Sequence, residues 1–256
     1  MSSERPVDRR TLVRGMAATA GGLLLSGCDK LYSNPKFQSF MRDAEHVTYR
    51  TQRALAGHGT LAREYSRSEM SPVFRVNGNV MPRSPDYQAH AQAGFADWRL
   101  IVDGLVARPL QLTLAHLAAA PQRAQITRHD CVEGWSAIGK WQGPQLAPLL
   151  RAAGMSSRAR YIVFHCADDF GGRPYYESID LDDALHPQTI LATHMNDQPV
   201  SVPHGAPIRL RVERQLGYKH AKYVMRIEAR ESLEGLHGGK GGFWEDGAGY
   251  AWYAGI

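Results

Sequence analysis

Apolar and polar positions along this chain form short runs that are typical of strands rather than of long helices. Tyr161–Cys166 is a mostly apolar run with the length of a buried strand, and residues 223–228 predict another strand. Residues 208–213 alternate apolar with charged positions, which predicts a strand with one charged face. The segments on either side of Asp103-Gly104 predict a hairpin, because Asp-Gly suits a two-residue turn between strands.

The helices that the pattern predicts are short, and each has a recognisable end. Thr113 can cap a helix over the next six residues, and Asp180 precedes a similar short segment. Gly154 is placed to end a helix over residues 145–153. Because strands and helices do not alternate in a βαβ rhythm, we expect an α+β fold of mixed, mainly antiparallel strands with short helices over residues 66–256.

The first 28 residues have the organisation of an export signal. A basic segment containing Arg9-Arg10 precedes an apolar stretch, which ends in the small residues before Cys28. The paired arginines resemble a twin-arginine signal, and the residues ending at Cys28 resemble a lipobox, which predicts lipid attachment at that cysteine. We therefore expect a periplasmic protein, with residues 29–65 forming a polar tether that contains one short helix.

Composition narrows the class of protein further. The 256 residues are 43% hydrophobic and 21% charged, which is ordinary globular usage. No apolar run reaches about 18 residues, so no transmembrane helix is expected and membrane contact would pass through the lipid anchor. Three cysteines without a Cys-x-x-Cys motif exclude a disulfide framework, and they give no sign of a zinc site or an attached c-type haem.

The formal charge of +5 invites a nucleic-acid hypothesis. Residues 1–27 contain four arginines and two acidic residues, so the chain without them carries +3. Much of the remaining excess lies in residues 209–222, where six basic side chains surround a glycine turn and suit an anionic group. The competing interpretation of this stretch is a solvated strand face.

Cys131 is the residue whose surroundings suggest chemistry. It lies among His129, Asp130 and Glu133, next to a glycine rather than inside an apolar run. Positive neighbours would lower the pKa of the thiol and yield a thiolate, which is both a nucleophile and a soft metal ligand. An inert, half-buried cysteine at a strand end is the alternative.

Four ordered blocks then make the chain recognisable. It resembles the sulfite oxidase-like, molybdopterin-dependent oxidoreductases, close to the bacterial branch that contains the methionine sulfoxide reductase catalytic subunit. The resemblance runs from about Phe74 to the C-terminus. It implies the sulfite oxidase-type molybdopterin-binding fold. The blocks are CVEGWS at 131–136, YYESIDLDDALHPQT at 175–189, HGAPIRL at 204–210 and GYKHAK at 217–222.

The resemblance implies a mononuclear molybdenum site. The thiolate of Cys131 would ligate molybdenum beside the two dithiolene sulfurs of one molybdopterin, and Glu133 would be a polar or proton-handling group near the metal. His204 stands where the reductase branch has asparagine, and Cys166 stands where it has a threonine near the pterin. The residues implied in cofactor binding are Asn77, Asn79, His129, Cys131, Cys166, His204, Arg209, His220, Ala221 and Lys222.

Several of these assignments remain open on the sequence. Either Asn77 or Asn79 could supply the early cofactor contact, and His129 could contact the cofactor or only hold its loop. Cys166 could line the site or be a buried strand cysteine, and a Cys131–Cys166 disulfide would remove the metal ligand.

The resemblance implies an exported oxidoreductase that transfers an oxygen atom and two electrons, acting as a sulfite oxidase or as an S-oxide reductase. Its electrons would cross to another protein, such as a membrane cytochrome b or a soluble cytochrome. Three other functions compete with this one: a thiol enzyme using Cys131, a non-catalytic pterin-fold binding module, and a nucleic-acid binder. The nucleic-acid binder is the weakest alternative, because an export signal and a site for an anionic cofactor already account for the basic residues.

Overall fold

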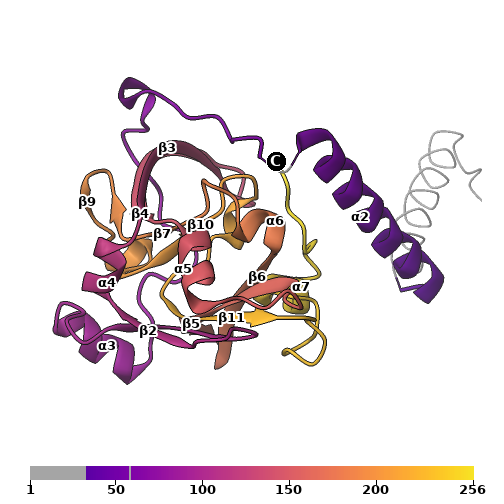
Figure 1. Ribbon diagram of the computed structural model, residues 1–256. Helices are drawn as coiled ribbons and strands as arrows, with labels where there is room; N and C mark the ends of the chain where they lie inside the picture. Colours follow the sequence, from indigo (N-terminus) through magenta and orange to yellow (C-terminus); the bar gives the residue numbers. More distant parts are fainter. Residues whose placement is uncertain (1–32, 58) are drawn as a thin grey trace, which may run out of the picture. The chain divides into compact units, whose positions relative to one another are not determined.

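The computed structural model describes residues 33–256 apart from residue 58, so the predicted export signal and lipid attachment lie outside the described residues (Figure 1). Its contacts divide the chain into one unit over Met1–Ala54 and a second over Leu55–Ile256. Helix α2 spans Pro35–Ala56, so the predicted tether contains a helix of 22 residues where we expected a short one. No helix within the described range has the length and apolar character needed to cross a bilayer.

The largest sheet of the second unit has five strands in the order β2-β1-β11-β5-β6. Strands β1 and β11 pair in parallel, and the other neighbours pair antiparallel. The strands are β1 (Arg99–Gly104), β2 (Leu110–Thr113), β5 (Tyr161–Phe170), β6 (Arg173–Asp180) and β11 (Val224–Arg230).

Two smaller sheets complete the strand structure, a four-stranded sheet β3-β4-β8-β9 and a pair β10-β7. Figure 1 shows β3 and β4 in the upper part of the view and β5, β6 and β11 in the lower part. The strands are β3 (Gln122–Asp130), β4 (Ser136–Pro144), β7 (Ile190–Ala192), β8 (His194–Met195), β9 (Gln198–Pro199) and β10 (Arg209–Arg211).

The remaining helices are short, as the sequence predicts. The α-helices are α3 (Pro85–Gln92), α4 (Leu114–Ala119), α5 (Leu146–Ala153), α6 (Leu181–Ala184) and α7 (Phe243–Ala248), and the 3-10 helices are η1 (Arg67–Glu69), η2 (Val202–His204) and η3 (Gly217–Lys219). Thr113 caps α4 by accepting from the backbone of His116, and Asp180 caps α6 in the same way through Asp183. Gly154 ends α5 at a φ of 69°, as predicted.

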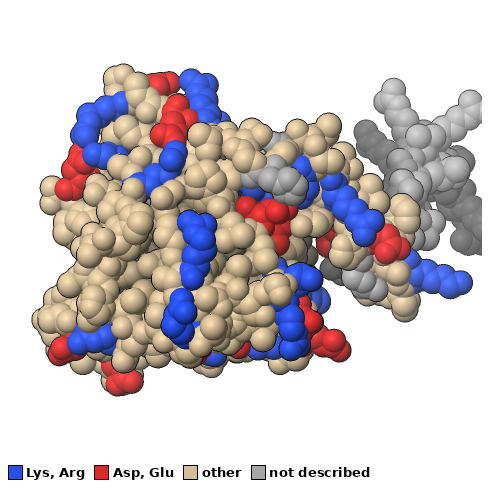
Figure 2. Space-filling model, in the orientation of Figure 1, with Lys and Arg blue, Asp and Glu red and all other residues tan. Residues whose placement is uncertain are grey.

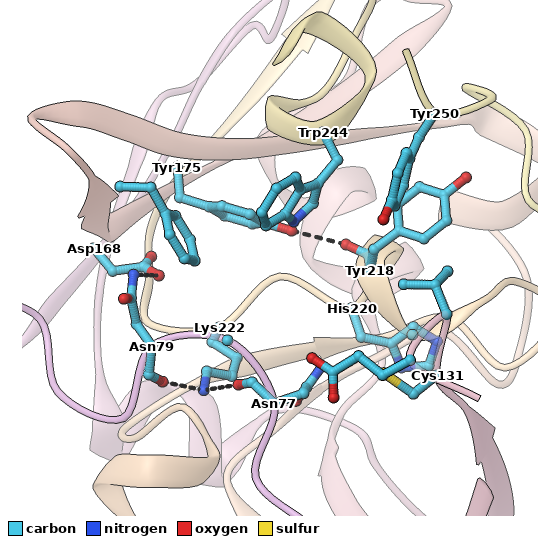
Figure 3. Close-up of a pocket in the computed structure, with 15 residues that line it drawn as sticks. Asn77, Asn79, Cys131, Asp168, Tyr175, Tyr218, His220, Lys222, Trp244 and Tyr250 are labelled. Atoms are coloured by element: carbon cyan, nitrogen blue, oxygen red, sulfur yellow. Dashed lines mark hydrogen bonds between the residues drawn. The ribbon is translucent and has the colours of Figure 1, made fainter. Parts of the chain in front are cut away.

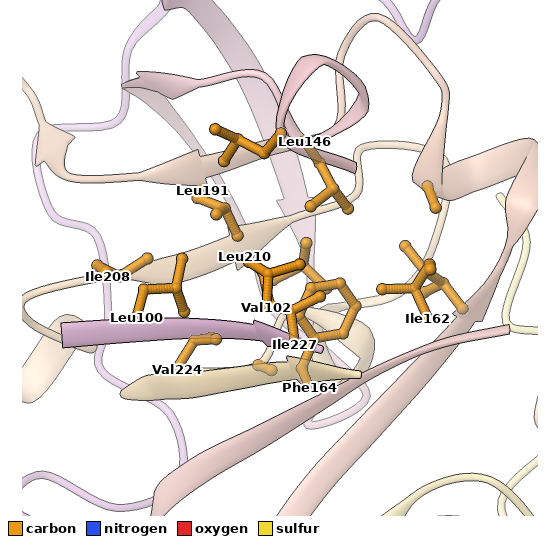
Figure 4. Packing of buried hydrophobic residues seen from close by; sticks show 14 of the residues in the cluster. Leu100, Val102, Leu146, Ile162, Phe164, Leu191, Ile208, Leu210, Val224 and Ile227 are labelled. Carbon is orange, nitrogen blue, oxygen red and sulfur yellow. The ribbon is translucent and has the colours of Figure 1, made fainter. Parts of the chain in front are cut away.

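The main core lies between one face of the five-stranded sheet and the elements packed on it. Val102 from β1, Phe164 from β5 and Leu146 from α5 have no exposed surface. Figure 4 shows these side chains meeting Leu191 and Leu210 from the β10-β7 pair. The mixed, mainly antiparallel α+β fold predicted from the sequence is confirmed. Packing in this core fixes the positions of the strands whose ends lie next to the candidate site.

The predicted hairpin forms, because β1 pairs antiparallel with β2, but the prediction that Asp103-Gly104 is its turn is wrong. Leu105 donates its amide to the carbonyl of Ala229, so the chain continues along β11 after Gly104 instead of reversing. A Cβ at Gly104 would lie 2.3 Å from that carbonyl oxygen, and its φ is +80°. The glycine is therefore required for the close approach of β1 to β11 and does not mark a two-residue turn.

The strand at 209–211 has its charged residues on one face, but the alternative of a solvated strand face is wrong. The six basic side chains between Arg209 and Lys222 are all buried, and Arg209 and Arg211 are at most 1% exposed. Tertiary contacts cover both faces of β10, so these residues do not form a solvated strand face. Figure 2 shows the surface lysines and arginines of one face intermixed with acidic residues, which gives no support to a nucleic-acid binder.

Candidate functional site

A cavity of about 170 Å³ opens where four loops and the C-terminal segment meet (Figure 3). The loop before α3, the turn after β3, the end of β5 and the region around η3 all reach it. The lining residues are Asn77, Gly78, Asn79, Cys131, Val132, Glu133, Asp168, Phe170, Tyr175, Gly217, Tyr218, His220, Lys222, Trp244 and Tyr250. Five of the predicted site residues therefore line the cavity together with Glu133.

Cys131 lies directly after β3, in a tight turn before β4. Its amide donates to the carbonyl of Trp135 at 2.9 Å, and the amide of Gly134 donates back to the Cys131 carbonyl at 3.0 Å. The side chain is 8% exposed, and burial raises the pKa of its thiol. We expected positive neighbours to lower this pKa, and that expectation is wrong, because burial and the negative charge of Glu133 raise it and outweigh a backbone hydrogen bond that lowers it. A protonated thiol is a weak nucleophile, whereas a bound metal displaces the proton.

Glu133 lies at the mouth of the cavity. Its side chain accepts a hydrogen bond from the indole N–H of Trp135 at 2.9 Å. This contact fixes the carboxylate beside Cys131 while leaving it exposed to solvent. The position suits a group that exchanges protons with water near the predicted metal ligand.

Cys166 does not line the cavity. Its side chain packs against the main core, and its thiol lies 3.9 Å from the carbonyl of Phe164 in its own strand. Both Cys131 and Cys166 are free thiols, so the alternative of a disulfide between them is wrong. The structure therefore favours the strand-cysteine interpretation, with the side chain partly buried against the core.

Lys222 fixes the loop that carries Asn77 and Asn79. Its ammonium group donates to the carbonyls of Asn77 and Pro203 at 2.8 Å each, and to the carbonyl of Asn79. An ammonium group has three protons, so these carbonyls occupy all of them. Burial, together with the nearby charge of Arg209, lowers the pKa of Lys222 to about 7. Both asparagines reach the cavity because this lysine holds their backbone.

Arg209 lies behind the cavity as a buried cation. Its guanidinium donates to the carbonyls of His204 at 2.9 Å and His220 at 3.4 Å, while its Nε has no partner in the described structure. Burial and Arg211 lower its pKa to about 9. Arg211 has a bidentate carboxylate partner in Glu213, but the described residues place no carboxylate within 4.0 Å of Arg209. Such a charge favours the binding of an anion.

His129 and His220 form a perpendicular pair with ring centroids 5.1 Å apart. Arg211 can only donate to Nδ1 of His129, which assigns the proton of that ring to Nε2. His220 donates from Nε2 to the carbonyl of Gln215, which makes its Nδ1 an acceptor. His129 Nε2 and His220 Nδ1 both lack partners among the described residues. Burial lowers the pKa of both rings, so the pair offers one neutral donor and one neutral acceptor.

Like Arg209, His129 and Cys166, the remaining two predicted residues lie outside the cavity lining. His204 bonds to the carbonyl of Phe74 and to the hydroxyl of Ser201, so both of its ring nitrogens have partners. Ala221 is fully buried in the core, and its carbonyl accepts from the amide of Leu210. These contacts fix the positions of β10 and of the loop that precedes it, next to residues that line the cavity.

Asp168 is a site residue that sequence reasoning missed. It lines the cavity and is only 4% exposed. Its Oδ2 accepts a hydrogen bond from the side-chain Nδ2 of Asn79 at 2.9 Å. Its Oδ1 has no partner in the described structure, and burial raises its pKa to about 6. A carboxylate oxygen in this position can accept an N–H group of a bound heterocycle. Only the fold brings Asp168 to Asn79, so no local sequence signal indicated it.

Replacing Asp168 with asparagine is expected to stabilise the cofactor-free protein at neutral pH and to weaken cofactor retention. A raised carboxyl pKa means that the folded state binds more protons than the unfolded state between pH 4 and 6, so this group lowers stability as pH rises through that window. A shift of about two units corresponds to about 3 kcal/mol at pH 8. Denaturant titration at pH 4 and pH 8 measures the gain, and equal gains at both pH values would contradict the prediction.

The C-terminal segment closes one side of the cavity. Trp244 and Tyr250 line it, and their rings stack with centroids 5.9 Å apart. Lys219, which is fully buried, donates to Glu245 of α7 at 2.7 Å and to Glu177 of β6. This ion triad attaches the segment to the five-stranded sheet, a role that the sequence did not indicate.

The residues around the cavity fit a molybdenum-pterin group. The thiol of Cys131 would be a soft ligand for the metal. The described residues contain no group of three or more His, Cys, Asp or Glu side chains that could bind a metal ion, so further ligands would have to come from the cofactor. The unpartnered Nε of Arg209 and Nε2–H of His129 suit anionic oxygens. The unpartnered oxygen of Asp168 suits N–H donors of a heterocycle.

Comparison with known proteins agrees with this geometry. Residues 87–235 match the family described as the oxidoreductase molybdopterin binding domain. A protein of Azospira oryzae named "Putative protein-methionine-sulfoxide reductase subunit YedZ1" is 38% identical over 253 residues, which cover 98% of this chain and 89% of that protein.

Two further relatives match over smaller parts of their own length. The protein-methionine-sulfoxide reductase catalytic subunit MsrP of Campylobacter jejuni is 31% identical over 52% of this chain and 48% of that protein. Mitochondrial sulfite oxidase of Drosophila melanogaster is 31% identical over 84% of this chain and 40% of that protein. The family resemblance, the fold class and the cofactor predicted from the sequence are confirmed. The chain belongs to the sulfite oxidase-like oxidoreductases that bind a molybdenum-molybdopterin cofactor.

Proposed function

We propose that this oxidoreductase reduces an uncharged organic S-oxide rather than oxidising sulfite. The observation that carries the proposal is the lining of the cavity, which contains one lysine and no arginine. The lysine is Lys222, whose three protons already bond to backbone carbonyls. An anionic sulfite would find no free cation in this lining, and it would meet the exposed carboxylate of Glu133.

The aromatic side of the cavity suits the apolar groups of such a substrate. Tyr175 donates its hydroxyl to the carbonyl of Tyr218 at 2.9 Å, and Tyr218 donates to the carbonyl of Ala251 at 2.6 Å. Because both hydroxyl protons are used, these rings offer apolar surface rather than further donors. Trp244 and Tyr250 extend that surface. A thioether that carries methyl or methylene groups gains from contact with it.

The reaction breaks the S=O bond, and the oxygen leaves as water after uptake of two electrons and two protons. When bound, the cofactor supplies a metal that exchanges an oxygen atom and two electrons. Glu133 supplies protons from solvent, since it is the exposed carboxylate beside Cys131. Arg209 and the His129–His220 pair hold the anionic and polar atoms of the pterin, and Lys222 keeps the Asn77–Asn79 loop in place.

The electrons come from a separate redox protein, a membrane cytochrome b or a soluble cytochrome. The similarity to a protein named as a reductase catalytic subunit, a term that implies a further subunit, supports an external donor. Export to the periplasm through the twin-arginine route, with lipid attachment at Cys28, belongs to the same proposal. It is supported by the order of basic, apolar and small residues before Cys28.

Steady-state kinetics on the cofactor-loaded protein test the proposed direction. Reduction of methionine sulfoxide or dimethyl sulfoxide by a chemically reduced dye is expected to show kcat/KM on the order of tenfold or more above that of sulfite oxidation. Sulfite oxidation with an equal or higher kcat/KM would overturn the proposal.

A further inference from the structure

Arg211 and Glu213 form a buried ion pair behind the cavity, and the proposed reaction uses neither residue. Their side chains have no exposed surface. Glu213 accepts from Nε of Arg211 at 2.9 Å and from Nη2 at 2.6 Å. Gln125, which is 2% exposed, donates a further hydrogen bond to the same carboxylate at 2.9 Å. Both carboxylate oxygens therefore have partners, and the bidentate contact holds the guanidinium in one orientation.

The remaining terminal nitrogen of Arg211 reaches His129. Nη1 lies 3.0 Å from Nδ1 of the histidine ring. A guanidinium has only donors, so Nδ1 must offer its lone pair and the ring proton must lie on Nε2. The hydrogen bond at one ring nitrogen thus decides the state of the other. Because Arg211 does not line the cavity, it acts on His129 from behind.

The protonated nitrogen of His129 lies next to a glycine that lines the cavity. A Cβ at Gly217 would lie 2.4 Å from Nε2, so only glycine leaves room for this nitrogen. Nε2 has no hydrogen-bond partner among the described residues. A buried donor without a partner is costly, which indicates that a bound group completes it.

The neighbouring ring of His220 depends on the same packing. His220 lines the cavity (Figure 3), and its Nε2 donates to the carbonyl of Gln215 at 3.1 Å. The rings of His129 and His220 meet at 88° with their centroids 5.1 Å apart. The orientation of His129 therefore also limits where the His220 ring can lie.

We propose that Glu213 and Arg211 are positioning residues for the cofactor: they hold His129 as the Nε2–H tautomer, so that the ring offers the molybdopterin a hydrogen-bond donor. Both residues act through His129 rather than by touching the cofactor. The proposal rests on the cofactor that the family binds and not on the direction of the reaction, so a protein that oxidised sulfite would leave it intact.

A double-mutant cycle on the cofactor-loaded protein tests the proposal. The variant Arg211→Met/Glu213→Gln removes both charges together and so leaves no buried ion without its partner. Its cofactor is expected to dissociate about tenfold faster than that of the wild type, measured as molybdenum and pterin fluorescence retained after dialysis. His129→Leu should show a similar loss. The combined variant should lose no more than either one, because the ion pair acts through the histidine.

The matched control is Asp103→Asn/Arg226→Met. It removes another arginine–carboxylate pair, in which Nε of Arg226 lies 2.8 and 2.9 Å from the two carboxylate oxygens, from residues outside the cavity lining. We expect this variant to retain its cofactor as the wild type does.

Nitrogen-15 NMR of the cofactor-free protein, labelled at histidine, gives a readout that is independent of activity and of cofactor loading. The His129 signals are assigned by their absence from His129→Leu. In the wild type we expect an unprotonated Nδ1 and a protonated Nε2. In Arg211→Met/Glu213→Gln we expect intermediate shifts, because the two tautomers then exchange.

Four results would overturn the proposal. The first is a wild-type His129 that carries its proton on Nδ1, a result that needs no variant to fold. The second is a His129 tautomer that is unchanged in Arg211→Met/Glu213→Gln. The third is cofactor loss in that variant no greater than in the control. The fourth is additive loss in the combined variant, which would show that the ion pair acts on the cofactor independently of His129.

Discussion

Purified Cys131→Ser protein is expected to contain roughly tenfold less molybdenum than the wild type, or still less, after expression in a host that makes the cofactor. Loss of an outer hydrogen-bond partner of a metal ligand alone costs about 10–100-fold in affinity, and Cys131 is the thiol that reaches the cavity. A serine hydroxyl remains protonated and is a hard, weak ligand for this metal. Metal analysis and pterin fluorescence on the same sample measure the effect, and oxygen-atom transfer should fall with the metal content.

Cys166→Ser is the matched control, since it removes the other thiol of the described region from a position outside the cavity lining. We expect this variant to keep its molybdenum. Equal metal loss in both variants would place Cys166 at the site. Full molybdenum in Cys131→Ser would remove Cys131 as the ligand, provided that both variants show the wild-type circular dichroism spectrum.

Lys219→Met is expected to destabilise the protein by about 3–5 kcal/mol at neutral pH. Lys219 has no exposed surface and lies between Glu177 and Glu245, so its loss leaves two buried carboxylates without their cation. Burial and Glu245 already raise the pKa of Glu177, and Lys219 opposes that rise. Without the lysine the pKa of Glu177 rises further, so the folded variant keeps this proton to a higher pH than the folded wild type does.

Because folded wild type already holds the Glu177 proton up to its own raised pKa, the deficit should be smallest in acid and should grow only as the pH rises above that pKa. Urea titration at pH 5 and pH 8 measures both values. Arg158→Met serves as the control, because it removes an exposed cation from the carboxylate of Glu231 and should leave the unfolding midpoint unchanged. A Lys219→Met deficit that is independent of pH would show that lost packing, and not charge, causes it.

The two variants probe opposite sides of one cavity. Cys131 ends a strand of the β3-β4 hairpin, whereas Lys219 attaches the segment that carries Trp244 and Tyr250. If the triad positions that segment, Lys219→Met should also weaken substrate binding in protein that remains folded. A raised KM at unchanged molybdenum content would support this positioning role.

Local sequence signals predicted the helix ends correctly, because a cap involves only residues a few positions apart. Thr113, Asp180 and Gly154 end or begin their helices where the sequence places them. The Asp-Gly signal predicted the wrong position for the turn, because the contact that decides the conformation of Gly104 is distant in the sequence. Gly104 meets the backbone of Ala229, more than a hundred residues away, and nothing near Gly104 in the sequence records that neighbour.

The sequence alone determined the family and the cofactor, and it predicted Cys131 as the metal ligand, because those depend on the identity and order of residues in a few blocks. Only the tertiary structure decided the states of these residues. It buried the basic stretch at 209–222, used every proton of Lys222 on backbone carbonyls, and left Arg209 without a counter-ion. It also brought Asp168 into the cavity and kept Cys166 out of its lining. Burial and partners depend on contacts between residues far apart in the chain, and those contacts exist only when the strands have assembled.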